Sequence, residues 1–192
     1  MTDIVYDTEF RAIGGIIDLI FLGAVNRTTG ERFYRVNADA DYETISRAAT
    51  RNTAWLCENV IPHLPLVVPI AKVRNGYNFH LDLTHPDVVS RTQFAEDWRN
   101  FILGTDNPRL CAWYGAYDHV AQASLFGTMS DMPGGVPWWT WDLKQWEETE
   151  GKRHGITHRM LPAGTGNAHN ALDDAIELAG WMNYLEEHGF VL

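Results

Sequence analysis

Two carboxylates lie inside the first apolar segment of the chain, at Asp7 and Glu9 within residues 4–10 (IVYDTEF). This segment is short and β-prone, and alternate side chains of a strand point to the same face of a sheet. Asp7 and Glu9 therefore share one face of a strand that is apolar enough to be central. Neighbouring buried carboxylates repel each other and lose solvation. A fold tolerates them readily if a cation lies between them. The alternative is that the strand ends at Glu9 and both side chains are solvated.

The remaining pattern predicts a mixed sheet with helices on its faces. Gly14-Gly15 and the polar turn at 26–30 separate three β-prone segments, and both connections are short enough for antiparallel hairpins. A fourth strand, flanked by helical segments, then follows, which indicates a mixed sheet with helices on its faces. We predict strands at 4–10, 16–25, 31–37 and 109–114, one or two helices within 41–60, a loop or short strand at 75–89, and helices at 90–104, 118–126, 142–150 and 170–188.

Three prolines, Pro62, Pro65 and Pro69, are expected to break the chain after the first helices, and residues 151–166 form a polar, basic, Gly-rich loop that we expect to be mobile. With 192 residues, the chain suits one domain over 1–192. The element order is that of an α/β, ribonuclease H-like fold: a mixed sheet of three antiparallel strands followed by a parallel strand, flanked by helices.

The formal net charge is −10, which argues against a protein that grips nucleic acid through a basic patch. Clustered carboxylates can still bind divalent cations, whose positive charge then meets phosphate. The charge therefore disfavours a nucleic-acid enzyme without excluding one.

Nothing in the sequence indicates a leader or a membrane segment. The N-terminus is acidic within three residues, and no apolar stretch approaches the ~18 residues of a membrane span. Cys57 and Cys111 lie far apart in apolar surroundings, so we expect two reduced, buried thiols. We therefore predict a cytoplasmic protein without a membrane partner.

A further carboxylate stands where the fourth strand gives way to a helix, at Asp118 in WYGAYDHVA. The small residues Gly115 and Ala116 before it would let a substrate backbone approach closely. The alternative is that Asp118 is an ordinary N-cap residue.

The third segment of interest is HNALDDA, in which His169 precedes Asp174 by five residues. On a regular helix these two side chains would point about 140° apart, so they converge only if His169 lies before the helix and Asn170 caps it. A histidine beside a metal-binding aspartate is suited to activating water. A solvent-facing histidine before an ordinary N-cap is the alternative.

In this order and spacing, the three segments resemble the DEDDh exonuclease superfamily, whose motifs are D-x-E, an aspartate after a strand, and H-x4-D. YDTEF, WYGAYDHVA and HNALDDA look most like a subfamily of small stand-alone mycobacterial exoribonucleases that prefer polyadenylate RNA. The resemblance implies a metal-dependent 3′→5′ exoribonuclease that acts as a homodimer on RNA with a single-stranded 3′ end and releases nucleoside 5′-monophosphates.

The resemblance also implies the roles of individual residues. His169 would be the general base. Two divalent cations, Mg²⁺ or Mn²⁺, would be held by four carboxylates: Asp7, Glu9, Asp118 and Asp174. Single-stranded DNA or very short oligoribonucleotides are alternative substrates, and a catalytically inactive nucleic-acid-binding module is an alternative of another class.

Three more residues are implied to contact the substrate. Thr8 would meet the terminal 3′-hydroxyl together with its neighbour Glu9. Phe10 and Tyr117 flank the predicted site and would stack on the last bases, or else belong to the core. The tryptophans of residues 138–141 are expected in the core or a dimer contact rather than on bases. The basic side chains of 151–166 either follow the phosphate backbone or are simply solvated.

Overall fold

The computed structural model describes residues 1–13 and 15–192, so Gly14 of the predicted Gly14-Gly15 break lies outside it. The strands are β1 (Thr2–Ile13), β2 (Ile16–Asn26), β3 (Arg32–Asn37), β4 (Leu66–Val73), β5 (Gly76–Leu81), β6 (Val88–Val89), β7 (Pro108–Ala112) and β8 (Thr140–Asp142). The α-helices are α1 (Tyr42–Arg47), α2 (Arg51–Asn59), α3 (Arg91–Leu103), α4 (Ala116–Ala123), α5 (Leu143–Trp146) and α6 (Ala171–Glu187).

A six-stranded sheet with the order β6-β3-β2-β1-β7-β8 forms the centre of the fold. Strand β2 is antiparallel to both of its neighbours, β1 and β3, whereas β7 runs parallel to β1 and β8 parallel to β7. This arrangement confirms the predicted α/β, ribonuclease H-like class. The strand β8 was not predicted, because three residues are too few to show a strand periodicity.

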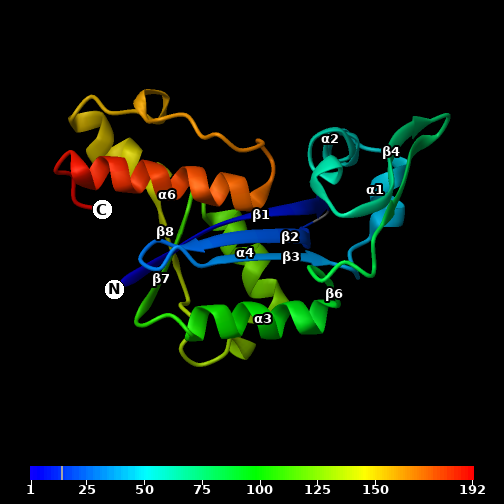
Figure 1. The fold of residues 1–192 in the computed structure, drawn as a ribbon, viewed down its shortest axis with the longest axis horizontal. Helices are drawn as coiled ribbons and strands as arrows, with labels where there is room; N and C mark the ends of the chain where they lie inside the picture. The colour runs from blue at the N-terminus through cyan, green and yellow to red at the C-terminus, as the bar shows by residue number, and fades with distance from the viewer. Residues whose placement is uncertain (14) are drawn as a thin grey trace.

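Helices cover both faces of this sheet, with α6 on one side and α3 on the other (Figure 1). Alternate residues of β1 divide between the two layers. Val5 packs with the buried side chains of α6, whereas Tyr6 packs with those of α3 and α4. By the same alternation Asp7 and Glu9 belong to the face that α6 covers.

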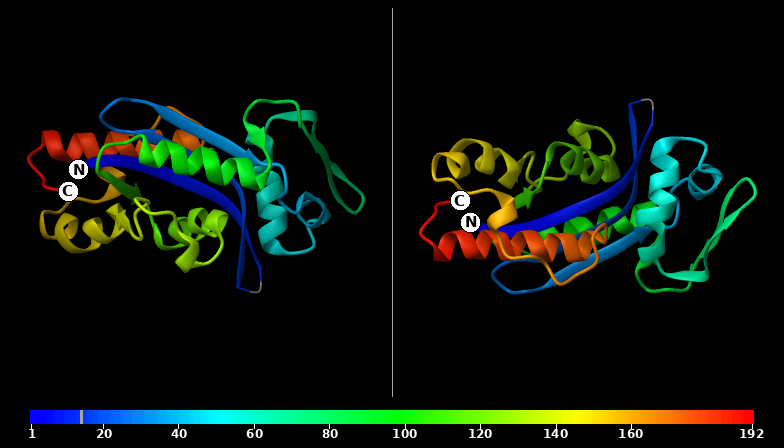
Figure 2. Two further views of the ribbon diagram at one scale, coloured as in Figure 1. Left: turned by 90° about the horizontal axis from the view of Figure 1, so that it is seen from below. Right: turned by 90° about the horizontal axis from the view of Figure 1, so that it is seen from above.

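The hairpin β4–β5 differs most from the prediction. It forms a separate two-stranded sheet and projects from one end of the molecule (Figures 1 and 2). Pro69 was expected to break the chain, but it lies inside β4. The pairing register shifts between Val68 and Ala71, on either side of this proline. A strand in a two-stranded sheet has a free edge, where the missing N–H of proline does little harm.

The predicted helix at 142–150 is shorter than expected. The helix α5 ends at Trp146, and the chain continues through the wider turns of Glu147–Gly151. Asp142 does cap α5, through Lys144 N. Cys57 and Cys111 are free and buried, as expected. Across the described part of the chain, helices long and apolar enough to span a membrane are absent.

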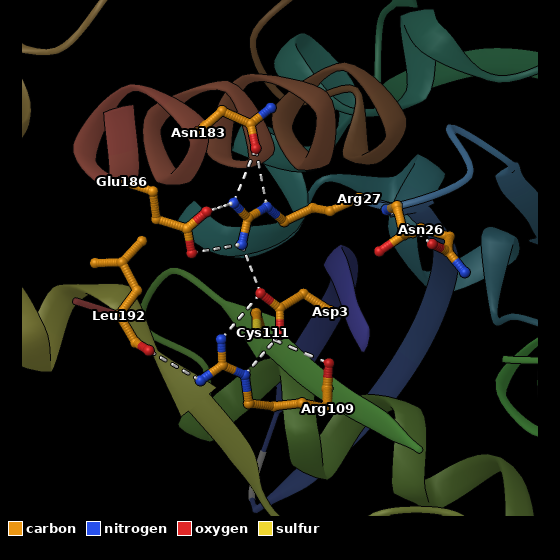
Figure 3. A network of polar contacts seen from close by, with 9 residues as sticks. Asp3, Asn26, Arg27, Arg109, Cys111, Asn183, Glu186 and Leu192 are labelled. Carbon is orange, nitrogen blue, oxygen red and sulfur yellow. Dashed lines mark hydrogen bonds and ion pairs between the residues drawn. The ribbon is translucent and has the colours of Figure 1, made fainter. Parts of the chain in front are cut away.

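A largely buried charge network joins the start of the chain to the end of helix α6 (Figure 3). Asp3 opens β1 and pairs in register with Arg109 of β7. Its carboxylate accepts from Arg109 Nε at 2.6 Å, and its second oxygen binds Arg27 Nη1 at 2.5 Å. Arg27 also binds Glu186 near the end of α6. Burial alone would raise the pKa of Asp3, but the two arginines outweigh this effect and lower it.

We expect Asp3→Ala to lower the free energy of unfolding by about 3 kcal/mol, because it leaves two poorly solvated guanidinium groups without their shared partner. Urea denaturation followed by circular dichroism measures this loss. The control is Glu43→Ala, which removes an exposed ion pair with Arg47 and should leave the midpoint unchanged. Equal effects of both variants would contradict the structural role of the network.

Candidate active site

The close approach of α6 to the sheet creates the site. Asp7 pairs in register with Gly23 of β2. A Cβ atom on Gly23 would lie only 2.1 Å from Leu172 N, so only glycine lets the first turn of α6 rest on β2. This contact brings Asp174, which lies in that turn, next to the two carboxylates of β1.

His169 lies just before α6, as its spacing from Asp174 predicted. Asn170 is the N-cap and accepts from Leu172 N and Asp173 N. At His169 the backbone turns through a positive φ of 66°, and its N–H donates to Asp174 Oδ2 at 2.9 Å. The turn brings the imidazole to the carboxylates: ligand atoms of Glu9, His169 and Asp174 all lie within 4.8 Å of one another. Nδ1 of His169 is 3.8 Å from Glu9 Oε1.

Asp118 approaches strand β1 from helix α4 and binds Thr8, the residue between Asp7 and Glu9. It is buried in the first turn of α4, and its Oδ1 accepts from Thr8 N at 3.0 Å and Thr8 Oγ1 at 2.6 Å. The N-cap of α4 is Gly115, so the alternative that Asp118 merely caps the helix is wrong. Thr8, predicted only as a substrate contact, orients a carboxylate here.

Burial raises the pKa of all four carboxyl groups, and neighbouring carboxylates of the site add to this effect at Asp7 and Glu9. Burial, followed by the charges of Asp174 and Asp118, raises the pKa of Glu9 to about 8. Burial also raises the pKa of Asp118 to about 6, against the opposing hydrogen bonds of Thr8. For Asp174 burial again raises the pKa to about 6. The pKa of Asp7 is raised well above its ordinary value by burial and by the other three carboxylates.

This donor set fits divalent cations. Four clustered carboxylates offer only oxygen ligands, which Mg²⁺ and Mn²⁺ prefer. Bound cations would compensate the negative charge that burial leaves poorly solvated at all four positions, and would relieve the repulsion that adds to the raised pKa of Asp7 and Glu9. Glu9, His169 and Asp174 form the closest group; Asp7 and Asp118 stand outside that group but act on it through their charges.

Phe10 and Tyr117 form an aromatic pair beside the site. Their ring centroids are 6.2 Å apart and nearly parallel, at 18°. Phe10 packs against the core beneath α3 and α4, whereas the side chain of Tyr117 is 63% exposed. Tyr117 is therefore the one of the two that offers a free ring face, with Phe10 as its support.

Sequence reasoning missed Trp55 of α2. Its ring meets the His169 imidazole edge-on, with centroids 4.8 Å apart. The buried stripe of α2 consists of Thr53, Leu56 and Cys57, so Trp55 lies off that stripe. A tryptophan on the polar side of an amphipathic helix is the signal that could have drawn attention to it.

Metal-free protein should lose stability as pH rises from about 4 to about 8. A carboxyl group whose pKa is higher in the folded state than in the unfolded state stabilises the fold while it is protonated. This contribution is fully present below the pKa of the unfolded state, about 4. That contribution disappears through about 6 for Asp118 and Asp174 and about 8 for Glu9. Melting temperatures in EDTA at pH 5 and pH 8 test this, and Mg²⁺ should restore the loss at pH 8. A melting temperature insensitive to both pH and Mg²⁺ would argue against a cation site.

Comparison with known proteins agrees with this geometry. No protein-family model matches the chain. A 3′-5′ exoribonuclease of Mycobacterium tuberculosis strain CDC 1551 is 34% identical over 173 residues, which cover 88% of this chain and 84% of the relative. The 3′-5′ exoribonuclease of strain H37Rv matches to the same extent. At this identity and coverage, the chain belongs to the family of these mycobacterial 3′-5′ exoribonucleases.

Proposed function

We propose that this protein is a metal-dependent 3′→5′ exoribonuclease of the DEDDh type, which removes nucleoside 5′-monophosphates from single-stranded 3′ ends of RNA. One observation carries the proposal. Strand β1, helix α4 and helix α6 bring four carboxylates together with one partly exposed histidine. These are the side chains of the D-x-E, Asp and H-x4-D pattern, and the relatives are named 3′-5′ exoribonucleases.

In this mechanism two divalent cations, Mg²⁺ or Mn²⁺, bound by Asp7, Glu9, Asp118 and Asp174, would supply Lewis-acid stabilisation of the phosphate charge. The imidazole of His169 takes a proton from water, the water oxygen forms a bond to the terminal phosphorus, and the bond from phosphorus to the 3′-oxygen of the preceding nucleotide breaks. That oxygen takes a proton from solvent and becomes the new 3′-hydroxyl, and the terminal nucleotide leaves as its 5′-monophosphate. The side chain of His169 is 45% exposed, which allows that water to arrive from solvent. The hydrogen bonds from Thr8 fix the rotation of Asp118.

Exposed aromatic rings beside the site support a single-stranded substrate. Tyr117 and Trp55 are exposed by 63% and 39%, and a base stacked on an aromatic ring gains about 1–3 kcal/mol. Purines stack best, so adenine-rich ends should be favoured. With a net charge of −10, the protein has little with which to hold a duplex backbone.

The proposal includes a homodimer in the cytoplasm. Support comes from large apolar side chains that remain on the surface near α4: Val120, Trp138 and Trp139 are each more than half exposed. Trp141, in contrast, packs against the α6 layer. Light scattering on the purified protein would distinguish a dimer from a monomer.

The activity itself can be tested on 5′-labelled RNA with a single-stranded 3′ tail, a blunt duplex and a 3′-phosphate end. We expect a ladder of single-nucleotide steps that stops near the duplex, poor cleavage of the other two substrates, and no reaction in EDTA. Matched DNA should be degraded more slowly. Internal cuts, removal from the 5′ end, or faster removal from DNA would each contradict part of the proposal.

Substitutions at the site should separate metal binding from proton transfer. Asp7→Asn or Asp174→Asn should reduce activity to a few percent or less while the fold remains intact, because each removes a charged cation ligand. His169→Ala should bind RNA and cations but react ~10²–10⁴-fold more slowly. The control is Asp106→Asn, an exposed acid on another loop. A nearly normal His169→Ala enzyme would remove histidine from the mechanism.

A further inference from the structure

The segment that leads into His169 depends on contacts for its position. After the short turn at His158–Met160, residues 161–169 include no helix or strand, although all of them are described. In Figure 1 this orange segment runs back along α6 and then turns into its first residue. Since the segment lacks a hydrogen-bonded ladder of its own, whatever holds it also places His169.

One stripe of α6 provides that hold. Asp173, Glu177 and Trp181 are spaced by four residues and therefore lie on one side of the helix. Each makes a hydrogen bond to the main chain of the segment. The three bonds run from Asn167 N to Asp173 Oδ2 (2.9 Å), from Gly164 N to Glu177 Oε1 (2.6 Å), and from Trp181 Nε1 to Pro162 O (2.8 Å).

The contact is close as well as polar. A Cβ atom on Gly166 would lie 2.4 Å from Asp173 Cβ, so the segment lies directly against the helix. Two of the three bonds join a main-chain N–H to a charged carboxylate, which makes them stronger than neutral hydrogen bonds. Trp181 is itself braced edge-on by Trp113, with ring centroids 5.4 Å apart.

The contacts with α6 continue up to His169 itself. Asn167 precedes His169 by two residues, and the N–H of His169 is bonded to Asp174 of the same helix. We propose that Asp173, Glu177 and Trp181 are positioning residues, which clamp residues 162–167 on α6 so that His169 stays beside Glu9 for proton transfer. This inference rests on the proposed function, because it needs His169 to act as the base.

The decisive comparison is between Glu177→Ala and Glu177→Gln. Glutamine loses the charge but keeps an oxygen that accepts from Gly164 N, whereas alanine loses both. For Glu177→Ala we expect kcat on RNA to fall by about 10- to 100-fold with KM changed less than about twofold, since the base acts on water and does not hold RNA. Glu177→Gln should restore most of kcat. Glu187→Ala, an exposed acid on the same helix, is the control and should match wild type.

Amide hydrogen exchange of residues 162–169, measured without RNA or metal, gives a second readout. Exchange should speed up in Glu177→Ala but not in Glu177→Gln. If kcat and exchange in Glu177→Ala equal those of wild type, or if both substitutions are equally harmful, the clamp is overturned while the exoribonuclease assignment stands. If the wild-type protein fails to degrade RNA, the proposed function is wrong. The catalytic role of the clamp is then wrong as well, even if the exchange results are as expected.

Discussion

The contact between Gly23 and the first turn of α6 is the constraint on which the site depends. Any side chain on Gly23 would overlap the backbone at Leu172, and α6 would have to move away from the sheet. Asp174 and His169 would then retreat from Asp7, which pairs with Gly23 on the neighbouring strand. The glycine at position 23 of β2 is thus needed for Asp7 and Asp174 to lie close together. Gly23 therefore serves both the packing of α6 on the sheet and the geometry of the site, and a substitution there would disturb both.

Strand β1 carries buried carboxyl groups at its start and farther along, and their surroundings shift the pKa values in opposite directions. At its start, Asp3 lies between two arginines, which lower its pKa. Farther along, burial and mutual repulsion raise the pKa of Asp7 and Glu9. Among the described residues, neither of these two has an arginine or lysine partner in an ion pair. The protein neutralises Asp3 with its own arginines, whereas Asp7 and Glu9 lack such partners in the part that the structure describes, as the proposed cation site requires.

Local sequence patterns predicted the parts of the fold that depend on local order. Alternation within 4–10 placed Asp7 and Glu9 on one face, and helical geometry required His169 to precede α6. The bond from Thr8 to Asp118 joins residues 110 positions apart, and the edge contact of Trp55 on His169 joins helix α2 to the turn before α6. Such pairs follow from tertiary packing, which leaves no periodic trace. Pro69 misled the prediction because a proline that breaks a central strand is tolerated in an edge strand.

The isolated hairpin β4–β5 has another consequence, for solubility. Within the described chain, each of its strands is paired on one side only, and its exposed side chains include Val67 and Val73. Such an edge invites pairing with a second molecule and the growth of aggregates. Pro69 interrupts the row of N–H donors, the register shifts around it bend the strand, and the charge of Lys72 repels a like edge. The proline that was expected to break the chain thus works against edge-to-edge pairing of this hairpin with another molecule.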